Sequence, residues 1–463
     1  MTVRKIHLTA ACGTGMGTLA CMLKDRGYEV TGSDRNIYPP MSDFLREKGI
    51  VLFDGYSEHN LDYGPDLVII GNAVKKDNCE AVKVMNEGIP YLSMPQALVR
   101  FFVDGRKVIL ITGTHGKTTT ASIMAWLLHD AGLDPSFLIG GIVRDFGSSY
   151  RLGKGEYFVI EGDEYDTAFF DKGPKFMHYD PFITIVTGIE FDHADIFDDI
   201  DHIKNVFRSL FRKLSPASLL VAPDADPNVN DIIQAARCRV KTFGRHGSSA
   251  SFDHYDITHA GSGFKIISRE AGEIDIQSSL MGTHNMNNIL AVACTLGETG
   301  CEAESLKKAL KTFTGVRRRQ EIRGVKNGIT VMDDFAHHPS AVRETVSAVK
   351  SFYTGGRILA VFEPGTNTSM RKIFQEQYPS SFIHADMVCI KEPGAIEKIP
   401  ENERISTEKM VLDISKLGID AYSFKWTDGI VDFMAQTAER GDVVLVMSNS
   451  GFDNIHEKLL NAL

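Results

Sequence analysis

A glycine-rich stretch at residues 111–120, ITGTHGKTTT, has the residue types of a phosphate-binding loop. Backbone N–H groups in such a turn, followed by a helix N-terminus, attract an anion. Lys117 would add a positive charge for the β- and γ-phosphates, and the hydroxyl of Thr118 would face Mg²⁺. The usual spacing, G-x-x-x-x-G-K-[ST], would need glycine at Ile111, whereas the first glycine is Gly113. We therefore predict a phosphate loop of a shortened form.

Carboxylates follow an apolar stretch at residues 157–160, and they are Glu161, Asp163, Glu164 and Asp166. Four carboxylates within six residues repel one another unless cations or hydrogen-bond donors lie among them. At the carboxyl end of a parallel strand they would face the crevice where α/β sheets place ligands. Mg²⁺ binds one or two carboxylates together with substrate phosphates. The alternative is an acidic, solvated loop.

A histidine lies between aspartates in residues 188–195, GIEFDHAD, directly after another apolar strand. His193 has Asp192 beside it and Asp195 close by. The imidazole could bind a metal or orient another group, and a structural or surface role is the alternative.

Two asparagines, Asn285 and Asn288, are three residues apart in residues 282–288, GTHNMNN. In a helix this spacing places both on one face. Their amides could contact the edge of a base, or they could cap the helix, which local spacing alone favours.

Basic and acidic residues flank a strand predicted at residues 329–332. Arg317, Arg318 and Arg319 precede it, and residues 332–339, MDDFAHHP, follow. Arginines beside phosphates stabilise the charge that develops in phosphoryl or acyl transfer. Asp334 and His337 would reach a ribose or a phosphate, and a solvated arginine run is the alternative.

The N-terminal segment CGTGMG, residues 12–17, gives a weaker nucleotide signal. It lacks a full G-x-G-x-x-G, because Ala10 and Ala11 occupy the earlier small positions. Small residues still permit close approach of a phosphate to the backbone.

Strands alternating with helices predict parallel βαβ units throughout the chain. The predicted strands cover residues 6–11, 28–32, 67–70, 108–111, 157–160, 183–186, 329–332, 358–362, 387–390 and 443–447. A polar turn at residues 104–107 marks one boundary. We predict an α/β protein of three domains in series, at residues 1–107, 108–315 and 316–463.

The composition indicates an ordinary globular protein. The chain has 463 residues, of which 43% are hydrophobic and 24% charged, and its net charge is −10. This charge gives no support to nucleic-acid binding. The seven cysteines contain no C-x-x-C pair, and neither a secretory signal nor an apolar run of about 18 residues occurs. We expect a cytoplasmic protein without membrane contact.

In order and spacing, GTHGKTTT, DEYD, EFDHAD, GTHNMNNILA, the arginine pair and DDFAHHP resemble the shared motifs of the Mur ligases. These are ATP-dependent, amide-forming enzymes of peptidoglycan synthesis. The resemblance implies a Rossmann-like N-terminal domain for the UDP-sugar, a central P-loop ATPase-like parallel sheet, and a Rossmann-like C-terminal domain for the amine substrate. Phosphate loops of this family share the short G-x-x-G-K-[ST] form.

The resemblance also assigns roles to individual residues. Lys117, Glu164 and His193 would be catalytic, and Mg²⁺ would be bound by Thr118, Glu164 and His193. The ATP site would comprise Gly113, Thr114, His115, Gly116, Lys117, Thr118, Thr119, Asn285, Asn288, Arg319, Asp334 and His337. The UDP-sugar site would comprise Gly13, Thr14, Gly15, Met16, Asp34 and Asn72.

Finer stretches, among them VTGSDRNIYPPMS, EYDTAFFDK, FEPGTNTS and MSNSGF, resemble the branch that attaches a preformed murein peptide. There, UDP-N-acetylmuramate would be activated as an acyl phosphate and attacked by the peptide's L-alanyl amine. The branch that adds free L-alanine has serine where this chain has Tyr165. Three positions depart from relatives: Ala10 and Gly365 replace glycine and arginine of the peptide branch, and Arg208 replaces a carbamylated lysine of several relatives, so we predict no carbamate.

Three alternatives stay open from the sequence. The first is a ligase for UDP-N-acetylmuramate and free L-alanine. The second is a nucleotide-switch ATPase with a protein partner, against which the Arg and Asp-His clusters of the third domain argue. The third is an NAD-dependent oxidoreductase, which rests only on CGTGMG followed by Asp34. The oligomeric state is not predicted.

Overall fold

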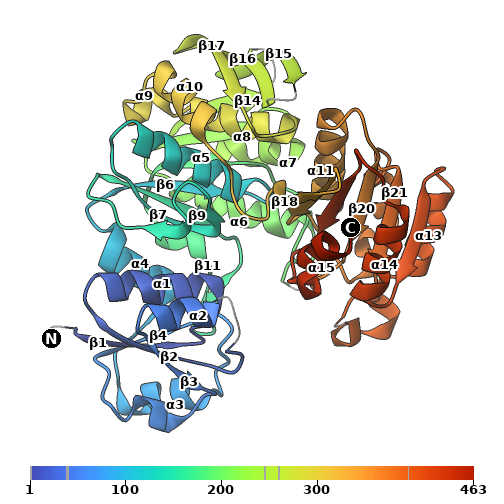
Figure 1. Cartoon of the computed structure of the whole chain (residues 1–463). Coiled ribbons are helices and arrows are strands. Elements are labelled where there is room, and N and C mark those ends of the chain that lie inside the picture. The colour runs from blue at the N-terminus through green and yellow to red at the C-terminus, as the bar shows by residue number, and fades with distance from the viewer. Residues whose placement is uncertain (1–2, 38–40, 195, 245–246, 259–260, 395) are drawn as a thin grey trace. The chain divides into compact units, whose positions relative to one another are not determined.

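The computed structural model describes residues 3–37, 41–194, 196–244, 247–258, 261–394 and 396–463 (Figure 1). The chain forms two compact units. The first contains residues 1–113, 120–189 and 203–242, and the second contains residues 114–119, 190–202 and 243–463. Within the described ranges, every helix is too short or too polar to cross a bilayer.

The first unit begins with a parallel five-stranded sheet in the order β3-β2-β1-β4-β5. Its strands are β1 (Lys5–Thr9), β2 (Glu29–Asp34), β3 (Val51–Asp54), β4 (Leu67–Ile70) and β5 (Tyr91–Ser93). Its helices are α1 (Thr14–Asp25), α2 (Met41–Glu47), α3 (Cys79–Glu87) and α4 (Met94–Leu98). The strand order reverses between β1 and β4, and ligands of doubly wound sheets bind outside the carboxyl ends at such a point.

The same unit contains the parallel core of the central sheet, in the order β14-β13-β12-β6-β9-β7, with β8 antiparallel at its edge. The strands are β6 (Lys107–Thr112), β7 (Ser136–Val143), β8 (Ser148–Arg151), β9 (Tyr157–Gly162), β12 (Pro181–Val186), β13 (Leu219–Pro223) and β14 (Arg239–Gly244). Three helices, α5 (Lys117–Asp130), α6 (Ile200–Lys213) and α7 (Pro227–Ile232), and the hairpin β10 (Asp166–Ala168) and β11 (Asp171–Pro174) complete it. The buried strand β6 lies between β12 and β9 and delivers the phosphate loop.

The second unit contains an antiparallel group that the sequence patterns did not predict. It consists of β15 (Ala250–Thr258), β16 (Gly261–Ser268) and β17 (Gly272–Ser278), followed by α8 (Thr283–Ala293), α9 (Leu296–Thr299) and α10 (Ala303–Thr312). In β16, Phe264 and Ile266 are buried and alternate with partly exposed residues. This period-two pattern indicates a sheet that is buried on one face.

A six-stranded sheet in the order β18-β19-β23-β20-β21-β22 completes the second unit, and all its strands except β18 are parallel. The strands are β18 (Glu321–Lys326), β19 (Ile329–Asp334), β20 (Ile358–Phe362), β21 (Met387–Lys391), β22 (Asp420–Phe424) and β23 (Val443–Met447). The helices are α11 (Pro339–Phe352), α12 (Tyr378–Ser381), α13 (Thr407–Ser415), α14 (Thr427–Thr437) and α15 (Ile455–Ala462).

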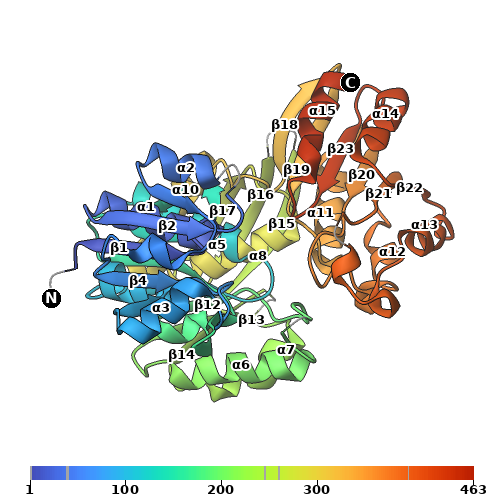
Figure 2. The same ribbon diagram turned by 90° about the horizontal axis from the view of Figure 1, so that it is seen from below.

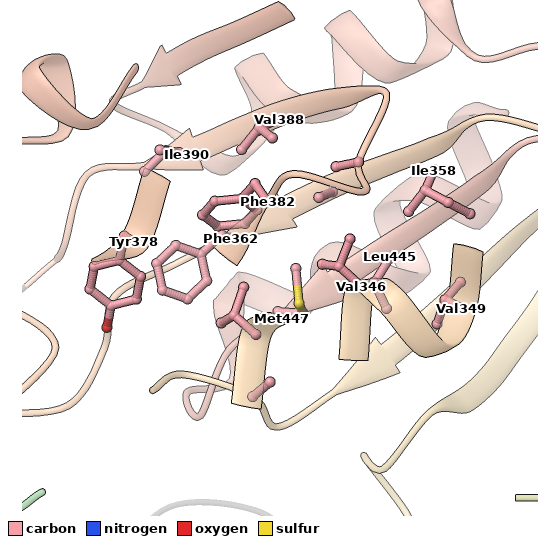
Figure 3. Close-up of a cluster of buried hydrophobic side chains, with 14 of the residues drawn as sticks. Val346, Val349, Ile358, Phe362, Tyr378, Phe382, Val388, Ile390, Leu445 and Met447 are labelled. Carbon is pink, nitrogen blue, oxygen red and sulfur yellow. The ribbon is translucent and has the colours of Figure 1, made fainter. Parts of the chain in front are cut away.

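Helices cover both faces of this sheet (Figures 1 and 2). Alternate residues of β20 enter two cores: Phe362 belongs to the cluster that contains Val346 and Val349 of α11, and Val361 belongs to the cluster formed with α14 and α15. Phe362 contacts the rings of Tyr378 and Phe382 (Figure 3). Because β20 is buried on both faces, its five residues are all apolar, and this run predicted the strand correctly from the sequence.

We predict that Phe362→Ala lowers the free energy of unfolding by about 3–5 kcal/mol, because truncation leaves a cavity between two aromatic rings. Urea denaturation followed by circular dichroism measures the change. The matched control is Ile383→Ala, since Ile383 is 57% exposed, and it should change stability by less than about 0.5 kcal/mol. Equal losses in both variants would contradict the assigned core.

Candidate active site

The phosphate loop joins β6 to α5 and contains two glycines at positions where no side chain fits. Gly113 and Gly116 have φ values of +120° and +83°. A Cβ atom on Gly113 would lie 2.5 Å from Oγ1 of Thr187, and one on Gly116 would lie 2.6 Å from Oδ1 of Asn288. Only glycine adopts such a backbone without strain and also permits these approaches. The shortened loop therefore depends on both glycines.

The first turn of α5 carries the predicted phosphate-binding side chains. Lys117 lies with Nζ 3.4 Å from the carbonyl oxygen of Thr114 and so folds back over the loop. Thr118 and Thr119 are each 8% exposed. The N–H groups in the first turn of a helix have no acceptor within that helix. The turn therefore combines N–H donors with a cation, as an anion site requires.

Glu190, which sequence analysis did not single out, is the centre of a polar cluster in the second unit. Its carboxylate accepts a hydrogen bond of 2.6 Å from the hydroxyl of Ser340. Nε2 of His115 lies 3.6 Å from the same oxygen, and Nδ1 of His338 lies 3.4 Å from it. Its backbone N–H donates to Oγ1 of Thr114. Burial opposes ionisation, yet His115, Ser340 and His338 lower the pKa of Glu190 to about 2.

Asp192 and His193 lie in a strained turn beside this cluster. His193 has a φ of +56°, and its N–H donates to the carboxylate of Asp192 at 2.7 Å. Asp192 is buried, and Nε2 of His337 lies 3.9 Å from its carboxylate. Burial opposes ionisation here too, but His193 and His337 keep the pKa of Asp192 below its usual value. Asp195, the other predicted neighbour, lies outside the described residues.

Burial governs the protonation of His337 itself. It lowers the pKa of this histidine to about 4, although Asp192 opposes the shift. The ring is therefore neutral at pH 7, and its Nδ1 donates to the carbonyl oxygen of Phe335 at 3.0 Å. Because Nδ1 carries the single proton, Nε2 has a lone pair and can accept a hydrogen bond from a ligand hydroxyl.

The two asparagines of α8 do not cap the helix, so the interpretation that local spacing favoured is wrong. The N-cap is Gly282, and no side chain caps the helix there. Asn288 donates to Asn285 at 3.1 Å, and Asn285 donates to the side chain of Gln320 at 3.1 Å. The backbone N–H of Gln320 donates in turn to Asp334 at 2.8 Å. These bonds tie α8 to the end of β19, and long-range contacts of this kind override local capping preference.

The three consecutive arginines differ in environment. Arg317 is exposed. Arg318 donates two hydrogen bonds of 2.7 Å to the carbonyl oxygens of Ser448 and Ser450, and it therefore holds the loop after β23. Arg319 lies over the ring of Phe335, with its guanidinium carbon 4.7 Å from the ring centre. Arg319 also lowers the pKa of Asp334, but burial outweighs it and raises that pKa overall.

The acidic segment after β9 belongs to the first unit, and each of its carboxylates has its own environment. Glu161 accepts a hydrogen bond from the backbone of Gly140 at 2.6 Å. Asp163 pairs with Lys175 at 2.9 Å, and Asp166 pairs with Lys172 at 3.1 Å. Glu164 is 4% exposed, the least of these four carboxylates. Glu164 is the most buried of the four, and it stays the predicted ligand.

The predicted UDP-sugar residues also lie in the first unit, around the carboxyl ends of β1 and β2. Asp34 accepts a hydrogen bond of 2.8 Å from the N–H of Cys12 and so shapes the turn before α1. Gly13 is the N-cap of α1, which begins with Thr14. The remaining members are Gly15, whose added Cβ would meet Met94 at 3.0 Å, the buried Met16 and the exposed Asn72.

Two of the positions predicted to depart from relatives have distinct local environments. Ala10 has a φ of +64°, a conformation that glycine adopts at lower cost, so glycine would be the less strained residue there. Arg208 donates to Asn205 on the same face of α6. An arginine cannot form the carbamate of lysine, and the absence of a carbamate stays a prediction.

Sequence reasoning missed Glu190, His338, Ser340 and Gln320. Glu190 and His338 lie inside motifs that were recognised, EFDHAD and DDFAHHP, but the neighbouring histidine was chosen in each motif. The sequence did contain a signal for this cluster, because His115, Glu190 and His338 each follow an apolar strand by a few residues. Gln320 gave no local signal, since its role arises from contact with α8.

Models of three domains match the chain: "Mur ligase family, catalytic domain" at residues 5–104, "Mur ligase middle domain" at 111–296, and "Mur ligase, glutamate ligase domain" at 318–450. The chain belongs to the Mur ligase family. It is therefore an ATP-dependent amide ligase, with three α/β domains in series. The exact domain boundaries, and the site residues, stay predictions.

Relatives extend along the whole chain. A UDP-N-acetylmuramate–L-alanyl-γ-D-glutamyl-meso-2,6-diaminoheptandioate ligase of Haemophilus influenzae is 39% identical over 463 residues, which span 100% of this chain and 99% of the relative. A UDP-N-acetylmuramate–L-alanine ligase of Acetivibrio thermocellus is 33% identical over 99% of this chain and 96% of the relative. The crystal structure of a murein peptide ligase from Psychrobacter arcticus is 34% identical, with a TM-score of 0.73 over 100% of this chain and 98% of that one.

We predict that Gly116→Ala raises the KM for ATP by about tenfold or more, because the new methyl group would push Asn288 away, a loss of about 1.4 kcal/mol in binding. Gly132→Ala is the matched control. Gly132 has a similar φ of +77° but nothing within 4 Å of an added Cβ. Both variants carry the same backbone strain, so an equal change in KM would contradict the role of the Gly116–Asn288 approach.

We predict a pH-dependent stability from His284. Burial, helped by Arg319, lowers its pKa from 6.5 to about 4. Between pH 6.5 and 4 the unfolded chain binds a proton that the folded chain does not, so stability falls as the pH falls through this window. The slope is about 1.4 kcal/mol per pH unit. Urea denaturation at several pH values should show this contribution removed in His284→Gln and retained in His59→Gln, whose ring is 88% exposed.

Proposed function

We propose that the chain joins the carboxylate of UDP-N-acetylmuramate to the amine of the preformed peptide L-alanyl-γ-D-glutamyl-meso-diaminopimelate. The full-length identity of 39% to a ligase of this substrate carries the proposal. Tyr165, which replaces the serine of the L-alanine-adding branch, supports it. Tyr165 is held in the acidic segment by Lys175, whose ammonium lies 4.3 Å from its ring centre.

The residues of the second unit suit a nucleotide. The side-chain amide nitrogen of Gln320 is shielded from solvent and has no hydrogen-bond partner among the described residues. Buried donors without partners are rare, so this group is suited to a ligand acceptor. Asn285 and Asn288 adjoin it, and Asn288 also abuts Gly116 of the phosphate loop. We assign the base side of ATP to this helix face and the phosphates to the loop.

Lys117 and the backbone N–H groups of the loop hold the β- and γ-phosphates in this proposal. Arg319, held over Phe335, supplies positive charge from the third domain, and the neutral His337 offers its Nε2 lone pair to a ribose hydroxyl. A carboxylate does not react with an amine at pH 7, so attack on the γ-phosphate to form an acyl phosphate divides one difficult step into two. Lys117 and Arg319 stabilise the charge that accumulates in both steps.

Thr118, Glu164 and His193 are the proposed Mg²⁺ ligands. A hydroxyl and a carboxylate provide the oxygen atoms that Mg²⁺ prefers, and phosphate oxygens complete such sites. Glu164, at 4% exposure, is a buried carboxylate for which a cation is a suitable neighbour. When bound, the ion supplies charge neutralisation between the phosphates.

The identity of the acceptor is tested by measuring the rate of ADP release with UDP-N-acetylmuramate, ATP and either the tripeptide or free L-alanine. We expect release to be at least about tenfold faster with the tripeptide, equivalent to about 1.4 kcal/mol in transition-state binding. Lys117→Ala serves as the inactive control and should abolish release while the UDP-sugar still binds. Faster release with L-alanine would contradict the proposal and favour the alternative, a ligase that adds free L-alanine. The 33% identity to an L-alanine ligase supports that alternative.

A further inference from the structure

The cluster around Glu190 brings two hydrogen-bond acceptors, Nδ1 of His338 and the Glu190 carboxylate, close together. Nε2 of His338 lies 3.2 Å from the carbonyl oxygen of Phe191, which can only accept, so Nε2 carries the proton. Nδ1 of the same ring lies 3.3 Å from the backbone N–H of Ser340, which can only donate, so Nδ1 carries a lone pair. That lone pair faces the carboxylate of Glu190 at 3.4 Å. Ser340 donates to both acceptors, through its backbone N–H to Nδ1 and through its hydroxyl to Glu190, and a cation bound between them would replace the first of these bonds and neutralise the carboxylate.

A third ligand atom completes the arrangement. Nε2 of His115 lies 3.6 Å from the same carboxylate oxygen of Glu190, and all three ligand atoms lie within 4.8 Å of one another. In a tetrahedral zinc site, ligands at 2.0–2.1 Å from the ion are about 3.3 Å apart. Two of the three separations therefore already match, and a small rotation of the His115 side chain would bring the third into range.

The surroundings resemble those of a metal site as well. Ligating histidines usually donate their other ring N–H to a carbonyl or carboxylate, which sets the tautomer. The bond from His338 to Phe191 does this, and the bond from Ser340 orients Glu190 in the same way. His338 is 5% exposed and packs edge-on against Phe374, so its ring is held in place.

We propose that His115, Glu190 and His338 form a binding site for a first-row transition-metal ion, with Zn²⁺ the preferred occupant and a fourth position open. Two imidazoles and one carboxylate favour Zn²⁺ over Mg²⁺, which prefers oxygen ligands. The site is separate from the proposed Mg²⁺ ligands. The proposal does not depend on which acceptor the ligase uses. An ion bound there links the phosphate loop to the start of α11 through three segments that are distant in sequence.

The test is calorimetric titration of the chelator-treated full-length protein with Zn²⁺, without nucleotide and with millimolar Mg²⁺ present. We expect one equivalent to bind, and binding at least about tenfold weaker in Glu190→Gln and His338→Gln. His59→Gln is the matched control, because His59 and Asp62 form an exposed histidine–carboxylate pair at 2.8 Å. That variant should bind Zn²⁺ as the unchanged chain does.

A spectroscopic measurement identifies the ligands. Co²⁺ in the same site should show the visible bands of a low-symmetry nitrogen and oxygen site, without the near-ultraviolet charge-transfer band of a thiolate. Circular dichroism confirms that each variant is folded, and His115→Gln replaces His338→Gln if that variant does not fold. Displacement of Zn²⁺ by Mg²⁺, a thiolate band from the free cysteines, or undiminished binding in both Glu190→Gln and the histidine variant would overturn the proposal.

Discussion

The close approach of the phosphate loop to its neighbours is the constraint on which the active site depends. At Gly116 the backbone comes so near the amide of Asn288 that even a methyl group would collide. Because α5 begins at the next residue, Lys117 directly follows the point where the loop approaches Asn288. The glycine at position 116 therefore brings the phosphate side of the proposed nucleotide site close to the asparagine assigned to its base side.

From that contact, a continuous series of hydrogen bonds leads to the third domain. Asn288 donates to Asn285, Asn285 donates to Gln320, and the backbone of Gln320 donates to Asp334. Asp334 also accepts from the N–H of Ala336 and the hydroxyl of Thr345. Asn285 also donates to the carbonyl oxygen of Met281, whereas displacement of Asp334 would leave the N–H of Gln320 without this acceptor, at a cost of about 1–3 kcal/mol. This cost makes the placement of β19 sensitive to the placement of α8.

Strands buried on both faces could be predicted from the sequence, and strands buried on one face could not. The predictions at residues 67–70, 358–362 and 443–447 coincide with β4, β20 and β23, because a continuous apolar run has few other uses in an α/β protein. The antiparallel strands β16 and β17 alternate between buried and more exposed residues, and β15–β17 contain many polar side chains, so they gave no such run.

Some features of the candidate site follow from local sequence, and others depend on contacts between residues far apart in the chain. Motifs located the phosphate loop, the acidic segment and the histidine clusters, because each follows a buried strand and parallel strands gather their carboxyl ends at one edge. Both Arg318 and Arg319 lie over Phe335, but motifs could not show that Arg318 holds the loop after β23. That role depends on its contacts with Ser448 and Ser450, more than a hundred positions away.

In the third domain, one neighbour limits which residue can stand at position 365. At Gly365 an added Cβ would lie 2.5 Å from Oδ1 of Asn449, so any larger residue there requires a different orientation of that asparagine. Nearby, Glu363 is 5% exposed and receives hydrogen bonds from Lys391 and Ser448. Removing either charge of this buried pair would leave the other uncompensated, which opposes substitution at both positions. Glycine at position 365 therefore leaves Asn449 undisturbed beside a pair that cannot itself be changed without cost.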